Sequence, residues 1–404
     1  MAESPPFLPY GRQVIEDDDI AAVAEALRAD MLTTGPRVEA FEQAFAEAVG
    51  ARHAVACANG TAALHLAMLA LDLKPGEAII APAVTFTATA NCARFCGAEV
   101  VFADVDPDTG LMTPETLAAA MGRQAGRRLR AVLPVHLAGH AVDLPGVRAL
   151  AESQGADLVE DACHALGTTM AFDNHPERAG DNRHSAMACF SFHPVKTIAT
   201  GEGGMVTTGD DALAERLRLF RTHGNSRDPA TFEAGGLGFD ADGNVNPWVY
   251  EMQALGYNYR LPDVLCALGI SQLSKLDRFI ARRKALTARY RTLIEPLAPR
   301  VRAVAAPRYC DSTLHLFIAL IDFEAAGLSR RRVMEGLRAK GIGSQVHYIP
   351  VHRQPYYRAR YGEIPLPGAD AYYARCLSLP LFPSMADTDP DRVVGTLAEV
   401  LGIG

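Results

Sequence analysis

Short apolar segments alternate with segments of helical periodicity through the first half of the chain. Between the short segments, apolar side chains recur every three and four residues, and Thr61–Leu73 is the clearest such helix. The predicted strands are Ala54–Cys57, Ala78–Ala81, Val100–Val105, Ala131–His136, Leu158–Asp161, Cys189–Phe192 and Gly204–Thr208. This alternation predicts βαβ units, so we expect an α/β fold with helices on both faces of a mainly parallel sheet.

The character of the sequence changes after residue 223. Gly224–Val245 is rich in Gly, Asp and Asn and has weak periodicity, which predicts a long loop of the kind that often carries function. An amphipathic helix is predicted over Leu261–Pro296. A smaller α/β segment follows, with predicted strands at His315–Asp322 and Gly343–Tyr348. We therefore expect a large domain over residues 1–260 and a small C-terminal domain, including the linking helix, over residues 261–404.

Composition and charge narrow the class of protein. The 404 residues suffice for two or three domains, and 49% hydrophobic with 21% charged residues is ordinary for a globular chain. A net charge of -8 argues against binding to nucleic acid or to an anionic membrane. We expect neither a signal peptide nor a membrane span. The eight cysteines, of which Cys92 and Cys96 are four apart, predict a reduced cytoplasmic protein without a metal site.

The first of four polar clusters, Asn59-Gly60-Thr61-Ala62, lies between a predicted strand and a predicted helix. Gly60 permits an unusual backbone conformation. The amides of a helix N-terminus, together with the Thr61 hydroxyl, can bind a phosphate. An ordinary helix cap is the alternative interpretation.

The second cluster follows an apolar strand, which ends in Glu160 and Asp161, with His164 three residues later. Ligands of open α/β sheets bind at the carboxyl ends of the strands, and a carboxylate there can keep a pyridinium nitrogen protonated. A helix cap is the alternative for the carboxylates, and a buried core histidine is the alternative for His164.

The third cluster runs from Ser191 to Lys196, where a strand leads through a turn fixed by Pro194. A buried lysine with a lowered pKa can form a Schiff base with an aldehyde, and Ser191 can bind a phosphate. A surface lysine is the alternative. The fourth cluster, Thr200–Gly204, fits either a glycine turn before a strand or close approach of the backbone to a bound group.

A phosphate turn, an aspartate and a lysine in this order are typical of fold-type I enzymes that use pyridoxal phosphate (PLP). The chain resembles the DegT/DnrJ/StrS family of sugar aminotransferases over nearly its whole length. The resemblance rests on Leu32–Pro36, Asn59–Ala62, Pro82–Phe86, Phe102–Asp106, Glu160–Gly167, Ser191–Gly204, Gly256–Leu261 and Val346–Tyr348. It implies a seven-stranded sheet in the large domain and a homodimer with shared active sites.

The resemblance also implies roles for the matching residues. Lys196 would form the internal aldimine with PLP and shuttle protons, and Asp161 would pair with the ring nitrogen. His164 would lie beside the ring near its 3-hydroxyl, and Phe86 would stack on the ring face. The implied phosphate ligands are Gly60, Thr61, Ala62 and Ser191, with Asn258 reaching the phosphate of the neighbouring subunit. The implied substrate-binding residues are Thr34, Arg260, His347 and Tyr348.

The implied reaction moves an amino group from L-glutamate to a ketone on a nucleotide-linked sugar. The segments Asn246–Arg260, His164–Gly167 and Gln345–His352 resemble the subgroup that contains the UDP-4-amino-4,6-dideoxy-N-acetyl-β-L-altrosamine transaminases of pseudaminic acid synthesis. Aminotransferases for a UDP-bacillosamine precursor, GDP-perosamine or a dTDP-linked sugar are alternatives. Lys196 disfavours a lysine-free sugar dehydratase, and a non-catalytic regulator is a further alternative.

Overall fold

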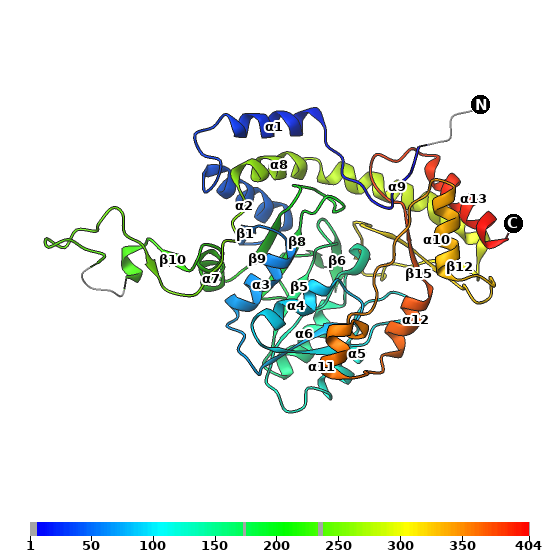
Figure 1. Ribbon diagram of the computed structural model, residues 1–404, viewed down its shortest axis with the longest axis horizontal. Coiled ribbons are helices and arrows are strands. Elements are labelled where there is room, and N and C mark those ends of the chain that lie inside the picture. Colours follow the sequence, from blue (N-terminus) through cyan, green and yellow to red (C-terminus); the bar gives the residue numbers. More distant parts are fainter. Residues whose placement is uncertain (1–5, 173–174, 233–236, 404) are drawn as a thin grey trace.

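The computed structural model describes residues 6–172, 175–232 and 237–403. A seven-stranded sheet forms its centre (Figure 1). In spatial order its strands are β1 (His53–Cys57), β9 (Gly204–Thr208), β8 (Met187–Ser191), β5 (Asp157–Asp161), β4 (Leu129–Val132), β2 (Ala78–Pro82) and β3 (Glu99–Ala103). Only β9 runs antiparallel to its neighbours within this sheet, so the prediction of a mainly parallel sheet is confirmed.

Helices surround the central sheet and continue into the C-terminal part of the chain (Figure 1). They are α1 (Asp17–Leu27), α2 (Pro36–Val49), α3 (Gly60–Ala70), α4 (Thr87–Phe95), α5 (Pro114–Met121), α6 (Leu144–Ser153), α7 (Asp211–Arg221), α8 (Asp263–Leu273), α9 (Leu276–Ile294), α10 (Arg330–Ala339), α11 (Pro355–Tyr361), α12 (Pro367–Arg375) and α13 (Asp389–Leu401). Short 3-10 turns occupy Leu137–Gly139, Pro229–Thr231, Glu295–Leu297 and Val351–Arg353. Among the described residues, no helix is both long and apolar enough to cross a membrane.

The smaller sheets lie outside the central one. An antiparallel sheet in the C-terminal part contains β12 (Val301–Ala303), β14 (Phe317–Ile321) and β15 (Cys376–Leu379). A second antiparallel sheet contains β13 (Cys310–Asp311), β6 (Thr169–Phe172) and β7 (His175–Arg178). The short pair β10 (Asn225–Ser226) and β11 (Glu251–Met252) completes the set.

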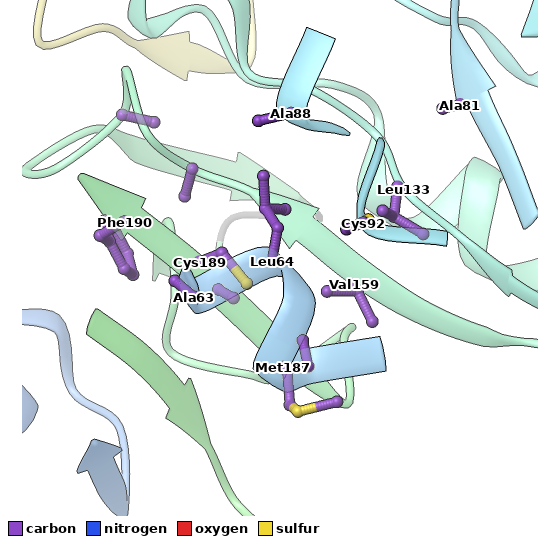
Figure 2. Close-up of a cluster of buried hydrophobic side chains, with 14 of the residues drawn as sticks. Ala63, Leu64, Ala81, Ala88, Cys92, Leu133, Val159, Met187, Cys189 and Phe190 are labelled. Carbon is purple, nitrogen blue, oxygen red and sulfur yellow. The ribbon is translucent and has the colours of Figure 1, made fainter. Parts of the chain in front are cut away.

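The main core lies between the central sheet and its helices. Helix α3 is apolar around most of its circumference, and Leu64 is among its fully buried residues, as expected for a helix enclosed by protein on all sides. Figure 2 shows Leu64 among Val159 of β5 and Cys189 of β8. A second apolar cluster gathers α9, α10, α13 and β14, and it also includes Leu8 from the N-terminal segment. The domain boundary at residue 260 stays a prediction.

Three element predictions were wrong in detail. The strand predicted over Ala131–His136 ends at Val132, although backbone bonds continue beyond it, from Leu133 to Ile80 and from His136 to Asp161. Gly343–Tyr348 is no strand, because its Gly343 amide bonds to Leu8 and only one bridge, from Gln345, reaches β15. The helix predicted over Leu261–Pro296 is divided into α8 and α9.

The division between α8 and α9 has an electrostatic cause at Lys275. Its amine lies 2.6 Å from a carboxylate oxygen of Asp18 and 2.7 Å from one of Asp19, at the start of α1. The side chain is only 7% exposed, and a buried ammonium requires such partners. The helix is therefore interrupted at Lys275, where its amine contacts residues far away in the sequence. The periodicity of the sequence does not predict this contact.

The predicted loop Gly224–Val245 belongs to an arm that projects from the body of the protein (Figure 1). The strands β10 and β11 pair at its base, where the Gln253 amide donates to the Gly224 carbonyl at 2.8 Å. A Cβ atom at Gly224 would lie 1.8 Å from the Ala254 carbonyl oxygen, so glycine is required at this close approach. The arm extends outward instead of folding over the chain's own sheet.

Candidate active site

The N-terminus of α3 and the end of β8 form a tight corner. The Asn59 side chain caps α3 by accepting the Ala62 amide at 2.8 Å, and α3 itself begins at Gly60. A Cβ atom at position 60 would lie 2.8 Å from the Ser191 Cβ and 3.4 Å from the Cys163 sulfur. Only glycine therefore leaves room between this helix start, with its positive dipole end, and the Ser191 hydroxyl. The corner can bind a phosphate through the first amides of α3 and Ser191.

Asp161 lies at the carboxyl end of β5, where its side chain is oriented by two donors. The Thr89 hydroxyl of α4 donates to Oδ2 at 2.7 Å, and the Cys163 amide donates to Oδ1 at 3.2 Å. Because the Thr89 proton points at Asp161, the Thr85 hydroxyl, 2.7 Å away, must donate to Thr89. Asp161 is only 5% exposed, so its carboxylate is held rigidly at the edge of the site.

Lys196 lies in the turn after β8 and is half-buried. Desolvation of its amine lowers its pKa, while the neighbouring Cys163 and Asp161 act in the opposite direction. A lysine whose pKa is lowered exists partly as the neutral amine, which is the form that attacks a carbonyl. The structure thus brings Lys196 and Asp161 into one electrostatic neighbourhood, beside the corner formed by Gly60 and Ser191.

His164 connects this neighbourhood to the C-terminal part of the chain. Its Nε2 lies 3.2 Å from the Tyr348 hydroxyl, and its ring lies 4.4 Å from that of His315. Burial lowers its pKa far below the usual value, and the nearby Lys196 and His347 side chains act in the same direction. His164 is therefore a neutral imidazole that works through hydrogen bonds.

A connected group of aromatic rings lies next to His164. The Phe86 ring is 57% exposed and lies 6.2 Å from Tyr348, and His347 lies 5.5 Å from Tyr10. The Nδ1 atom of His347 lies 2.7 Å from the Ser378 hydroxyl. A flat ligand can pack against such rings, and their polar atoms can bind its hydroxyl groups.

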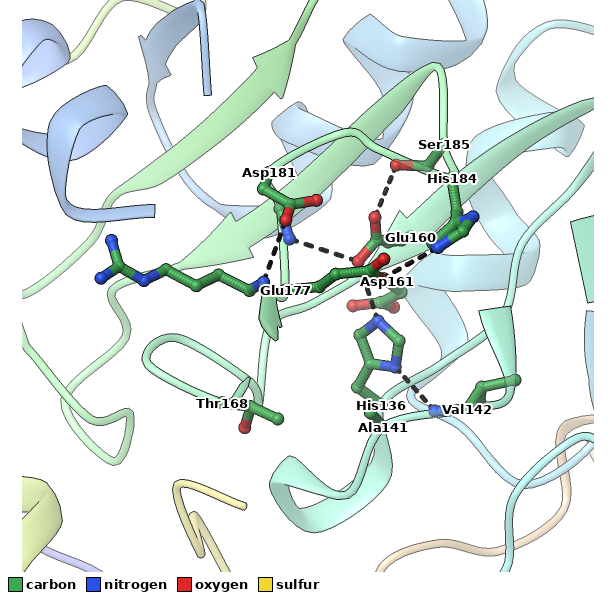
Figure 3. A network of polar contacts seen from close by, with 12 residues as sticks. His136, Ala141, Val142, Glu160, Asp161, Thr168, Glu177, Asp181, His184 and Ser185 are labelled. Carbon is green, nitrogen blue, oxygen red and sulfur yellow. Dashed lines mark hydrogen bonds and ion pairs between the residues drawn. The ribbon is translucent and has the colours of Figure 1, made fainter. Parts of the chain in front are cut away.

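A buried polar network surrounds Glu160 (Figure 3). Because consecutive strand residues point to opposite faces, this network lies behind Asp161. Glu160 is 1% exposed; its Oε2 lies 3.0 Å from His136 Nε2, and its Oε1 accepts the Ser185 hydroxyl at 2.5 Å. His136 Nδ1 in turn accepts the Val142 amide at 3.1 Å. Glu160 therefore has a structural role, in which it ties the segment after β4 to β5.

Three predicted site residues make no side-chain hydrogen bond with this cluster within the described chain. Asn258 is exposed and forms a backbone bridge with Thr222. Thr34 is exposed in the turn between α1 and α2, where its φ is 59°. Arg260 is half-buried, two residues before the cap of α8. Among the described residues, none of the three forms a hydrogen bond or an ion pair with Lys196.

The structure adds site residues that sequence reasoning missed. Thr89 could have been noticed, because it is a polar residue one helical turn after Thr85 on a predicted helix. Tyr10 and His315 offered no local signal. The segment of Tyr10 is placed by long-range contacts, such as the Leu381 amide donating to its carbonyl, and Gly11 lies against Val195.

These residues fit pyridoxal phosphate by their chemistry. The site combines an anion corner at Gly60 and Ser191, a carboxylate suited to a pyridinium nitrogen and an amine suited to an aldehyde. The exposed Phe86 ring supplies an aromatic face beside them. Among the described residues, no group of three or more His, Cys, Asp or Glu side chains could hold a metal ion, and the cysteines described are free.

Comparisons with known proteins agree with a site for pyridoxal phosphate. Residues 13–398 match the DegT/DnrJ/EryC1/StrS aminotransferase family. Helicobacter pylori PseC, an aminotransferase involved in the biosynthesis of pseudoaminic acid, is 26% identical, with a TM-score of 0.86 over 98% of this chain and 99% of PseC. DesV of S. venezuelae, solved with a ketimine intermediate, is 30% identical, with a TM-score of 0.83 over 98% of this chain and 99% of DesV.

DesI was solved in the presence of its TDP-sugar product. It is 31% identical to this chain, with a TM-score of 0.83 over 99% of this chain and 93% of DesI. The family match spans nearly the whole sequence, and the fold-type I sheet is present in full. The chain therefore belongs to the DegT/DnrJ/EryC1/StrS family and is a pyridoxal-phosphate-dependent sugar aminotransferase.

Proposed function

We propose that the enzyme transfers the amino group of L-glutamate to C4 of a UDP-linked 4-keto-6-deoxy-N-acetylhexosamine. The product would be UDP-4-amino-4,6-dideoxy-N-acetyl-β-L-altrosamine, in a pseudaminic acid pathway of the cytoplasm. The observation that carries the aminotransferase chemistry is the desolvated amine of Lys196 in the neighbourhood of Asp161 and the anion corner. The choice of sugar is supported by the likeness to PseC over almost the full length of both chains.

The cofactor, when bound, supplies an electron sink and carries the amino group between the two substrates. Gly60, Thr61 and Ser191 would hold its phosphate. The amide of Ala62, a further candidate, already donates to Asn59 in this structure. Asp161, fixed by Thr89, would keep a proton on the ring nitrogen. Phe86 would pack on the ring face.

Lys196 would provide the proton transfers. Its amine, in the neutral form that desolvation favours, would take the proton from the α-carbon of glutamate and deliver it to the C4′ carbon of the cofactor. The aromatic wall around Tyr10, His347 and Tyr348 would exclude water and orient the sugar. The substitution Lys196→Ala should abolish turnover while leaving the phosphate corner able to bind the cofactor.

A homodimer with shared active sites completes the proposal. The arm exposes apolar and aromatic side chains, with Leu237, Trp248 and Tyr250 at 73%, 72% and 55% exposure. Exposed apolar side chains in such number on one projecting element mark an interaction surface. We infer that the arm packs on a second copy. Asn258, Arg260 and Thr34, which form no hydrogen bond with Lys196 in the described chain, would complete the site of that copy.

A dTDP-linked keto sugar is the second candidate, because DesI, solved with a TDP-sugar product, is 31% identical, whereas PseC is 26% identical. Identity at this level does not separate the two substrates. The test is to incubate the purified enzyme with glutamate and, in parallel, UDP-, GDP- and dTDP-linked 4-keto-6-deoxy sugars. We expect 2-oxoglutarate and an amino sugar from the UDP-linked N-acetyl substrate alone.

The same assay separates the remaining alternatives. Turnover restricted to a GDP- or dTDP-linked ketone would reject the pseudaminic acid substrate and leave the aminotransferase assignment intact. Loss of water from the sugar without formation of 2-oxoglutarate would indicate a dehydratase. A colourless protein that binds no added pyridoxal phosphate would indicate a non-catalytic regulator.

A further inference from the structure

The hydrogen bonds around His164 determine which of its nitrogens carries a proton. The Ala138 amide donates to Nδ1 at 3.3 Å, so Nδ1 must present a lone pair. Ala138 is held in a left-handed conformation, with φ of 60°, and its carbonyl accepts the Leu316 amide. Burial lowers the pKa of His164, so the ring is neutral and its single proton lies on Nε2.

This tautomer assigns the donor in the contact between His164 and Tyr348. Nε2 is 3.2 Å from the Tyr348 oxygen, and because Nε2 carries the proton, the histidine donates and the tyrosine accepts. The proton of the Tyr348 hydroxyl then points elsewhere. Within residues 6–172, 175–232 and 237–403 no protein acceptor takes it, and it is therefore available to a ligand.

The location of Tyr348 indicates which ligand atom it serves. Its hydroxyl belongs to the electrostatic neighbourhood of Asp161 and Cys163, and its ring faces Phe86 at 6.2 Å. Burial raises the pKa of the phenol well above its usual value, so the group keeps its proton. A cofactor ring that places its nitrogen at Asp161 and its aldehyde carbon at Lys196 has one further oxygen attached to the ring itself, at position 3.

We propose that the Tyr348 hydroxyl donates a hydrogen bond to the 3-oxygen of the cofactor, and that His164 acts through Tyr348 as a positioning residue. This inference rests on the proposed placement of the cofactor between Asp161 and Lys196. It reassigns the group that contacts the 3-oxygen, because both nitrogens of His164 are occupied by protein partners.

The first test titrates the absorbance of bound pyridoxal phosphate with pH in the wild type and in Tyr348→Phe. A donor at the 3-oxygen withdraws electron density from it, which weakens its hold on the proton of the nitrogen attached to the aldehyde carbon. Removal of the donor should therefore raise the pH midpoint by about one to two units, the effect of one hydrogen bond to a charged group. An unchanged midpoint would overturn the proposal.

Tyr372→Phe is the matched control. Tyr372 is a buried tyrosine of α12, and its hydroxyl already donates to the His347 carbonyl at 3.2 Å. We expect its removal to leave the midpoint in place. His164→Phe should raise the midpoint by less than Tyr348→Phe, since the tyrosine keeps its hydroxyl and loses only its orientation. A midpoint that moves equally in the control would count against a specific role for Tyr348.

A second test uses cofactor affinity and needs no turnover. Tyr348→Phe should bind pyridoxal phosphate about tenfold more weakly than the wild type, and both proteins should bind 3-deoxypyridoxal phosphate equally. If Tyr348→Phe raises only the KM for the sugar, the hydroxyl serves the sugar and the inference fails. If the midpoint shifts but no keto sugar is aminated, the proposed function fails while the inference stands.

Discussion

Thr89 shows how a single side chain acts on the site without contacting a substrate. It is fully buried in α4, a helix that supplies no other hydrogen bond to Asp161 among the described residues, and its hydroxyl donates to the Asp161 carboxylate at 2.7 Å. Thr85 donates to Thr89 in turn. In its proposed role Asp161 would keep a ring nitrogen protonated, and a carboxylate does this best when its position is fixed, as these hydroxyl groups fix it here.

We expect Thr89→Val to lower kcat by about tenfold to a hundredfold, because a hydrogen bond to a charged group is removed from the site. Valine keeps the branched shape of threonine, so the fold should survive. Steady-state kinetics with glutamate and the keto sugar, together with thermal unfolding, give the comparison. Thr292→Val, an exposed threonine on α9, is the control, and equal kcat in both variants would rule out this role for Thr89.

At the scale of elements, the two faces of strand β5 have different roles: one faces the candidate site and the other faces a buried polar network. Consecutive residues of a strand point to opposite faces, so Asp161 faces the ligand site and Glu160 faces the buried network of His136 and Ser185 (Figure 3). The acidic pair looked alike in the sequence, where both residues were candidates for a helix cap. The pleat of the strand directs the Asp161 and Glu160 side chains to opposite faces, so the two carboxylates have different roles.

The variant Ser185→Ala should lower the free energy of unfolding by about 1–2 kcal/mol, because Glu160 loses a donor in a buried place. Turnover should change little, since the network lies behind the site. Urea denaturation measures the first quantity. Ser153→Ala, which removes an exposed hydroxyl bonded to the Leu150 carbonyl, should leave stability almost unchanged. Equal losses in both serine variants would contradict a special role for the network.

At the scale of the whole molecule, the exposed apolar side chains of the projecting arm support the proposed homodimer. Trp248→Glu places a charge on an exposed aromatic side chain of the arm, where we infer contact with a second copy. We expect the wild type to sediment as a dimer and this variant to shift toward a monomer, with activity lost in parallel. Tyr356→Glu on α11, also an exposed aromatic, is the control and should remain dimeric.

Buried histidines couple the stability of the whole molecule to pH. Burial lowers the pKa of His65 and of His140 to about 4, and that of His347 to about 3. In the unfolded chain a histidine has its usual pKa of about 6.5. Below this pH the unfolded state therefore binds protons that the folded state does not bind. The free energy of unfolding should therefore fall as the pH drops from about 6.5 toward 4, by about 1.4 kcal/mol per pH unit for each such histidine.

Urea unfolding at pH 7.5 and pH 5.5 measures this dependence. In His140→Asn the loss of stability between the two conditions should be smaller than in the wild type, because one of the contributing imidazoles is gone. His193→Asn, at an exposed position, should keep the dependence of the wild type. An identical pH dependence in all three proteins would contradict the assignment to buried histidines.

The sequence by itself determined the α/β class, the strands that carry Asp161 and Lys196, and the glycine corner, because strand and helix periodicity and turn residues act over short stretches of chain. Only the tertiary structure decided that Thr89 holds Asp161, that Tyr10 joins the wall and that Tyr348 accepts from His164. The same holds for the outward course of the arm and for the turn at Lys275. These features depend on contacts between residues far apart in the chain. The packing of whole elements determines which residues meet, and local sequence patterns do not predict such contacts.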